Sequence, residues 1–259
     1  MVLDWLIDLH KAEEKPWRML VLGFIYSSVA AGLALLIFPS QASAILLVLT
    51  VAAFMPIMLN LMKIEELKEE KSRFLIKQHW PALKFFVFLF VGMIIAYTLW
   101  FAAMPAEIAK SLFSMQLETI AGRGVELGAL TGLNSFAGIL ANNSRVLIVG
   151  LMLAFVFGAG AVFILDWNAT ILGVLLGNLF HHRVDFSAAR YLVHGIPEIT
   201  AYFVAGLAGG IISAAIARHK IGTKQFNNVL KDSAGLIVLS IIILIIAALL
   251  EVYVSPLIG

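Results

Sequence analysis

The chain has 259 residues, of which 61% are hydrophobic and 13% are charged, and its mean hydropathy is +0.98. The apolar residues fall in long runs that a core of this size could not bury, so the composition excludes a soluble globular domain. The net charge of +2 is too small to indicate nucleic-acid binding, and the absence of cysteine excludes disulfides, thiolate metal sites and a cysteine nucleophile.

These apolar runs are continuous rather than alternating, which predicts helices, because in lipid a chain must satisfy its own backbone hydrogen bonds. The predicted fold class is an all-α, polytopic transmembrane helical bundle. A span needs about 20 apolar residues. The stretches that reach this length are Met19–Phe38, Ala42–Met62, Lys84–Met104, Ser144–Leu165, Tyr191–Ala217 and Ser233–Val254.

The chain divides into two regions, residues 1–104 and residues 105–259. The first begins with Met1–Arg18, which mixes acidic and basic residues and predicts an amphipathic lead-in helix rather than a removed signal peptide. Three spans follow, and Lys63–Lys84 between the second and third predicts a solvated helical extension with Glu and Lys four residues apart. The second region begins with Pro105–Gly124, which predicts an amphipathic helix at the membrane interface.

The basic residues gather in two loops, 63–84 and 218–231, and such loops stay in the cytoplasm. Three spans separate the loops, so one more crossing is needed to bring both to one side. Leu127–Ala141 or Ala169–Phe180 could supply it as a short half-helix or re-entrant segment, and Arg145 slightly favours the first. We therefore expect six full spans plus one or more short segments, with the N-terminus cytoplasmic and the C-terminus outside.

The fifth predicted span contains His194 and Glu198, which are four residues apart and so share one face of a helix. Small residues continue this face at four-residue spacing. The imidazole and the carboxylate therefore point into a seam where two helices pack closely, and not into lipid. The small residues assigned to this seam are Ala205, Gly209 and Ser213, facing Gly158 and Gly160 of the preceding span.

An unpaired polar side chain is costly in lipid, so we expect His194 and Glu198 to lie in an intramembrane polar cluster. The other candidate members are Asn142, Asn143, Asn178 and Glu251. Asn143 also suits the N-cap of the fourth span. The cluster either clamps helices together or serves catalysis, transport or a metal, which His194 and Glu198 would hold. The chain contains no complete set of catalytic residues, and we expect no other cofactor.

Four motifs occur in order over Phe136–Pro256: ILANNSRVLIVG, LLGNL, HGIPEITAYFVAGLAGG and AALLEVYVSP. Together they resemble the stage II sporulation protein M family of integral membrane proteins. One departure is the middle motif, where the family often has Asn then Gly and this chain has Gly177 and Asn178. The matching positions are Asn142, Asn143, Asn178, His194, Gly195, Glu198, Glu251 and Pro256.

In endospore-forming bacteria the family member recruits two peptidoglycan-degrading partners to the membrane during engulfment. The resemblance therefore implies a membrane scaffold or membrane-remodelling subunit that docks membrane or cell-envelope proteins. A transporter or permease that uses the His/Glu/Asn cluster is an alternative, and an intramembrane metal-dependent hydrolase is a third. We also expect a homodimer in the lipid bilayer, because C2 pairing is the commonest homo-oligomer.

Overall fold

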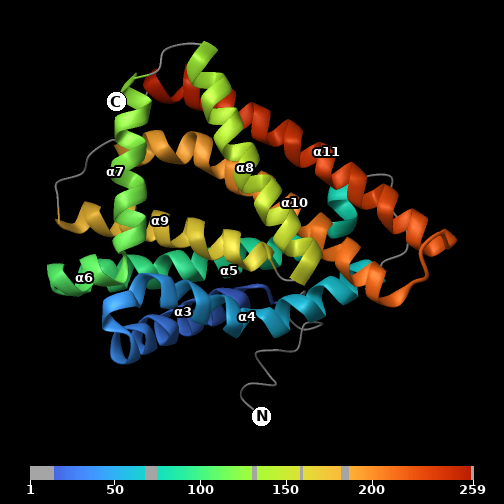
Figure 1. Cartoon of the computed structure of the whole chain (residues 1–259), viewed down its shortest axis with the longest axis horizontal. Helices are drawn as coiled ribbons and strands as arrows, with labels where there is room; N and C mark the ends of the chain where they lie inside the picture. Colours follow the sequence, from blue (N-terminus) through green and yellow to red (C-terminus); the bar gives the residue numbers. More distant parts are fainter. Residues whose placement is uncertain (1–14, 68–74, 130–132, 158–159, 182–186, 258–259) are drawn as a thin grey trace.

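The computed structural model describes residues 15–67, 75–129, 133–157, 160–181 and 187–257. Every regular element within these ranges is a helix, and the elements are numbered as in Figure 1. They are α3 (Trp17–Ile37), η1 (Pro39–Gln41), α4 (Ala42–Glu66), α5 (Leu75–Ala103), α6 (Ala106–Leu112), α7 (Ser114–Ala129), α8 (Leu133–Phe157), α9 (Ala161–His181), α10 (Ser187–Arg218), α11 (Lys224–Tyr253) and η2 (Ser255–Leu257).

Seven of the described helices are long and apolar enough to cross a membrane: α3, α4, α5, α8, α9, α10 and α11. The predicted all-α transmembrane bundle is therefore confirmed. The remaining α-helices, α6 and α7, lie at one end of the bundle, where α7 runs across the ends of the long helices (Figure 1). The single interfacial helix predicted over 105–124 is in fact two helices, α6 and α7.

The boundaries of the fourth predicted span are wrong. Ser144–Leu165 covers the second half of α8 and the start of α9, two helices that fold back on each other. Gly160 allows this tight return, because a Cβ there would collide with the backbone of Leu153 and Ala154. Gly160 thus packs against α8 within the α8–α9 hairpin, its place in the predicted seam with α10 stays a prediction, and Gly158 lies outside the described residues.

This hairpin also shows where the seventh crossing comes from. Ala169–Phe180 belongs to α9, which is a full-length helix and not a half-helix. Leu127–Ala141, which Arg145 favoured, instead begins in α7 and ends in α8. With α9 included, the two basic loops come to the same end of the bundle, which we call the basic end; the other is the motif end.

Contacts at the basic end confirm that the two loops share it. The Glu66 carboxylate at the end of α4 lies 2.5 Å from Nε2 of His219 and 3.5 Å from Nε of Arg218, at the end of α10. Glu65 lies 2.7 Å from Nδ1 of His79, near the start of α5. These side chains join α4, α5 and α10 at one level.

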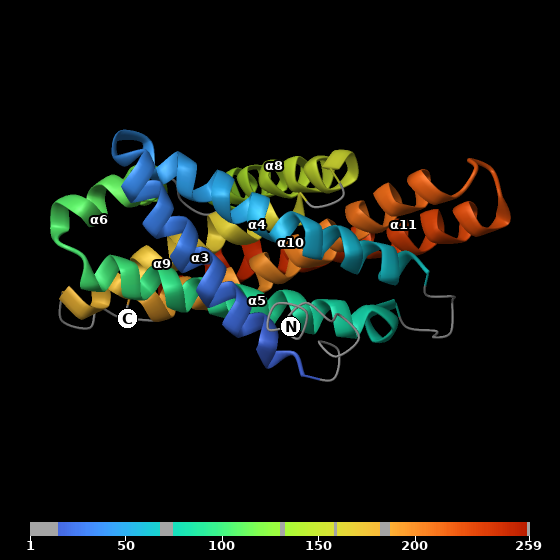
Figure 2. The same ribbon diagram turned by 90° about the horizontal axis from the view of Figure 1, so that it is seen from below.

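The interior is held by close helix packing, which matters in lipid because burial of apolar surface gives little preference for protein over lipid. Gly23 of α3 and Gly92 of α5 allow their two helices to pack closely. A Cβ atom on Gly92 would collide with the carbonyl oxygen of Leu20 in α3. Around α10, which is the most buried span, the ring of Phe203 packs 5.4 Å from that of Phe90. Figure 1 shows α5 and α10 between α3–α4 and α11, and Figure 2 shows α3 crossing α5.

Candidate functional site

At the motif end, His194 joins the start of α10 to the end of α11. Its Nδ1 atom lies 3.0 Å from Oγ of Ser255, and its Nε2 atom lies 3.9 Å from Oε1 of Glu251. The imidazole and the serine are buried. Pro256 follows Ser255 in the 3₁₀ turn η2, where it ends α11 and returns Ser255 to α10. Both ring nitrogens of His194 thus face a polar partner.

Glu198 lies one turn further along α10, on the same face as His194. Its Oε1 atom accepts a hydrogen bond of 2.6 Å from the Tyr202 hydroxyl, and both side chains are buried. Tyr202 packs in turn with Leu147 of α8 and Ile164 of α9. The buried Glu198 carboxylate thus has a tyrosine partner that was not predicted from the sequence.

Asn142 and Asn143 lie in the interior of α8, nine and ten residues after its start, so the predicted N-cap role of Asn143 is wrong. Asn143 is buried, whereas Asn142 is exposed and donates a hydrogen bond of 3.2 Å to Oδ1 of Asn143. Polar side chains in a helix interior at this depth need partners inside the protein.

The register of α8 on α10 places Asn143 level with Glu198. A Cβ on Gly209 would lie 2.8 Å from the Leu151 carbonyl oxygen and 2.9 Å from Cβ of Ala154, so the two helices touch there. They run parallel, because one crossing, α9, separates them. Asn143 precedes Ala154 by the same 11 residues that separate Glu198 from Gly209. A shared cluster of His194, Glu198 and Asn143 stays a prediction, and this register supports it.

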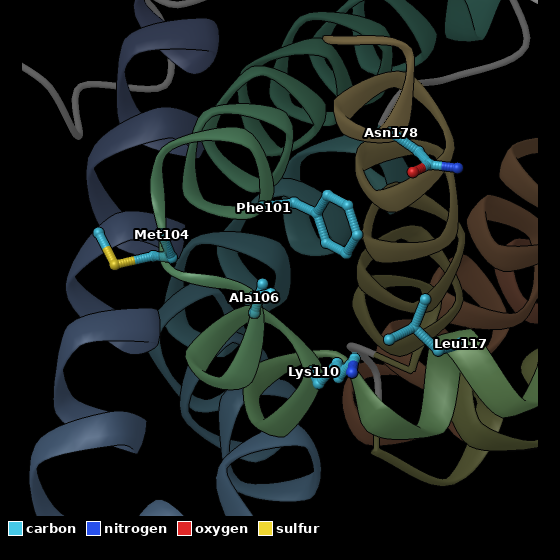
Figure 3. A pocket seen from close by; sticks show the side chains of 7 residues that line it. Phe101, Met104, Ala106, Lys110, Leu117 and Asn178 are labelled. Atoms are coloured by element: carbon cyan, nitrogen blue, oxygen red, sulfur yellow. The ribbon is translucent and has the colours of Figure 1, made fainter. Parts of the chain in front are cut away.

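Asn178 lies in a different setting. It is exposed and lines a cavity of about 310 Å³ between α5, α6, α7 and α9, with Lys110 among the other lining residues (Figure 3). A Cβ on the neighbouring Gly177 would lie 2.9 Å from Cδ1 of Phe101 and 3.0 Å from its Cβ. Close packing of α9 on α5 thus accounts for the glycine of this motif.

A second polar group, which was not predicted from the sequence, lies at the centre of the bundle. Asp166 of α9 is 0% exposed, and its Oδ1 atom lies 2.5 Å from the Tyr97 hydroxyl of α5. Tyr97 lies in turn 3.1 Å from Oγ1 of Thr50 in α4. The signal was present in LDWNAT, a charge inside an apolar stretch, but the misplaced span boundary put it at a helix end.

None of the described side chains forms a group of three or more His, Cys, Asp or Glu residues that could hold a metal ion. A metal at His194 and Glu198 stays a prediction.

Residues 82–256, well over half of the chain, match the family model described as Stage II sporulation protein M. The chain belongs to the stage II sporulation protein M family. An uncharacterized protein of Methanocaldococcus jannaschii is 33% identical over 127 residues, which cover 47% of this chain and 71% of the relative. No solved structure matches the chain.

The matched part of this family member includes His194, Glu198, Glu251 and Ser255 at the motif end, and both Tyr97 and Asp166. Thr50 lies before the matched range, in the second of the predicted spans, where none of the four motifs occurs. The family assignment confirms the resemblance drawn from the motifs and, with the seven apolar helices, supports residence in a membrane.

Proposed function

We propose that this family member is an integral membrane scaffold or membrane-remodelling subunit that docks a partner protein along α8. The observation that carries the proposal is Arg145, an exposed cation inside a membrane span. It lies ten residues after Ser135 and twelve before Phe157, or about 15 and 18 Å along the helix from the two ends of that span. A charge facing lipid at such a depth is costly.

The helix that carries Arg145 is the most open of the spans. Only 22% of its most apolar window is buried, against 67% for α10. Arg145 has no ion-pair partner among the residues that the structure describes. The exposed face of α8 around Arg145 includes Asn142, Ile148, Val149, Met152, Phe155 and Val156.

The charge on this face indicates what the partner must offer. A second copy placed symmetrically on α8 would bring two Arg145 guanidinium groups together, and like charges repel strongly where water is excluded. A transmembrane helix with a carboxylate at the depth of Arg145 would pair with the cation, while its apolar side chains cover Ile148 and Val149. The predicted homodimer would then use another surface, since the Gly209 seam is occupied by α8 within one chain.

Site-specific photo-crosslinking in native membranes tests the docking face. We expect a photoreactive residue at Ile148 to form a discrete protein adduct. The matched control is Val238 of α11, which is equally exposed, at 57% against 56% for Ile148. Arg145→Lys should retain the adduct and Arg145→Glu should abolish it. Only lipid adducts at Ile148, or the same adducts from Val238, would contradict the proposal.

A transporter is the second candidate, and Asp166 is the observation that favours it. A carboxyl group at the centre of a bundle, with hydroxyl groups from neighbouring helices, is the kind of site that pumps and transporters use to handle protons. Uptake assays in proteoliposomes, with and without a proton gradient, would separate this candidate from a scaffold.

A further inference from the structure

The side chains of the group around Asp166 come from four separate spans, and the group is sealed from solvent. Asp166 comes from α9, Tyr97 from α5 and Thr50 from α4, and each is 0% exposed. The buried Ser27 hydroxyl of α3 also faces Tyr97. All four helices are candidate membrane spans. The second carboxylate oxygen of Asp166, Oδ2, is buried without a hydrogen-bond partner.

An ionised carboxylate in this place would have little to stabilise its charge. No Lys, Arg or His of the described residues pairs with Asp166. A buried oxygen without a hydrogen-bond partner is costly on an ionised group in a low dielectric. A neutral carboxylic acid avoids most of that cost.

Counting hydrogens favours the neutral form independently. Three contacts run in a chain: Asp166 to Tyr97 at 2.5 Å, Tyr97 to Thr50 at 3.1 Å, and Thr50 to the Leu46 carbonyl oxygen at 2.9 Å. A tyrosine and a threonine hydroxyl carry one hydrogen each. Two hydrogens cannot complete three hydrogen bonds. A proton on the carboxyl group supplies the third, so that Asp166 donates to Tyr97, Tyr97 to Thr50, and Thr50 to Leu46.

The distances fit a proton better than a metal cation. The oxygens lie 2.5 and 3.1 Å apart, as they do in direct hydrogen bonds. A hard cation would instead lie between six or more oxygens at about 2.0–2.6 Å from each of them.

Few other titratable groups face this site from the helices packed around it. On α5 and α4 the nearest is Tyr97 itself, while His79, Glu65 and Glu66 lie at the basic end. On α3, Arg18 lies in the first turn, and the ring of Tyr26 packs against that of Phe54. On α10, Tyr202 is engaged with Glu198 on the side of the helix that packs on α8. On α8, Arg145 is exposed on the outer face.

We propose that Asp166 is a proton-binding site at the centre of the bundle, where the chain Asp166–Tyr97–Thr50–Leu46 holds a neutral carboxylic acid at neutral pH. The proposal does not depend on partner docking, and it assigns a ligand, the proton, to a group separate from His194 and Glu198 at the motif end.

Infrared spectroscopy of the purified full chain in lipid nanodiscs at pH 7 tests the proposal. We expect a carboxylic-acid C=O band that shifts when the protein is made with ¹³C-carboxyl aspartate, which requires no variant. Asp166→Asn should remove this band, and Tyr97→Phe should keep it at a shifted frequency because the hydrogen-bond acceptor is lost. Asp232→Asn, in α11, is the matched control and should leave it unchanged.

Thermal unfolding supplies a second, independent measurement. The amide of Asp166→Asn can donate to Tyr97 as the protonated acid does, so its midpoint should equal that of the wild type, while Asp166→Ala should unfold earlier. The proposal is overturned if labelled aspartate shows only carboxylate bands. It is equally overturned if Asp166→Asn lowers the midpoint as much as Asp166→Ala does.

Discussion

The Nδ1 atom of His194 lies 3.0 Å from the Oγ atom of Ser255, although the two residues are 61 positions apart in the chain. Glu251 lies 3.9 Å from the other ring nitrogen, so α10 and the end of α11 are joined by one imidazole. The same end of the bundle holds Glu198 and, by the register of the helices, Asn143. Among the motif residues, His194 and Glu251 therefore connect two helices.

The first prediction concerns this connection. Ser255→Ala should lower the free energy of unfolding by about 1–3 kcal/mol, because it leaves a buried ring nitrogen without its hydrogen-bond partner. Thermal unfolding in detergent measures the effect. Ser240→Ala, at a buried serine that bonds only its own helix, is the control and should cost less. An equal loss of unfolding free energy in both variants would show that the contact between His194 and Ser255 does not stabilise the fold.

A second prediction tests whether Asn143 and Glu198 belong to one cluster. A double-mutant cycle with Asn143→Ala and Glu198→Gln should give a coupling free energy of about 0.5–3 kcal/mol, as for residues in one hydrogen-bond network. Asn142→Ala in place of Asn143→Ala should give a smaller coupling, because Asn142 is exposed. Additive effects of Asn143 and Glu198 would remove Asn143 from the cluster.

A third prediction uses two glycines in otherwise similar helical positions. Gly92→Ala should destabilise the fold by about 1–3 kcal/mol, because its Cβ would collide with the Leu20 carbonyl oxygen. In Gly32→Ala the new Cβ would lie 3.9 Å from the nearest atom, on Trp100, so the change should be neutral or stabilising by up to about 1 kcal/mol. Unfolding midpoints compare them, and equal effects would mean that α3 and α5 do not approach as described.

The fourth prediction concerns topology. Single cysteines introduced at Lys77 and Lys224 should react with a membrane-impermeant reagent from the same side, and we expect that side to be the cytoplasm. A cysteine at Lys110, beside the cavity at the motif end, should react from the other side. The natural chain has no cysteine, so no background residue needs removal. Opposite labelling of Lys77 and Lys224 would mean that α9 does not cross.

Local patterns predicted much of this fold. Apolar runs indicated six spans, and placing the two basic loops on one side of the membrane required a seventh crossing. What the patterns did not reveal was the hairpin between α8 and α9. An apolar run continues through Gly158–Gly160, and composition alone does not distinguish a glycine that permits close packing from one that permits a turn.

Because this one boundary was wrong, the polar group around Asp166 was not predicted from the sequence. With the fourth span ending at Leu165, Asp166 was placed at a helix end, where a carboxylate can be solvated by water and needs no partner in the protein. In α9 it is five residues inside a helix, and its partners Tyr97 and Thr50 come from segments 69 or more residues away. Contacts such as these, like that between Glu65 and His79, depend on which helices are neighbours.

The position of Ser255 so late in the chain has a consequence for how the protein is made. During synthesis α10 reaches the membrane before α11 exists, so His194 enters with neither Ser255 nor Glu251 to meet it. Until the last span is inserted, the start of α10 must be accommodated by the insertion machinery, by water at the interface or by Glu198 one turn away. A nascent chain arrested before Glu251 would therefore expose a polar helix face that quality-control proteases and chaperones in the membrane can recognise.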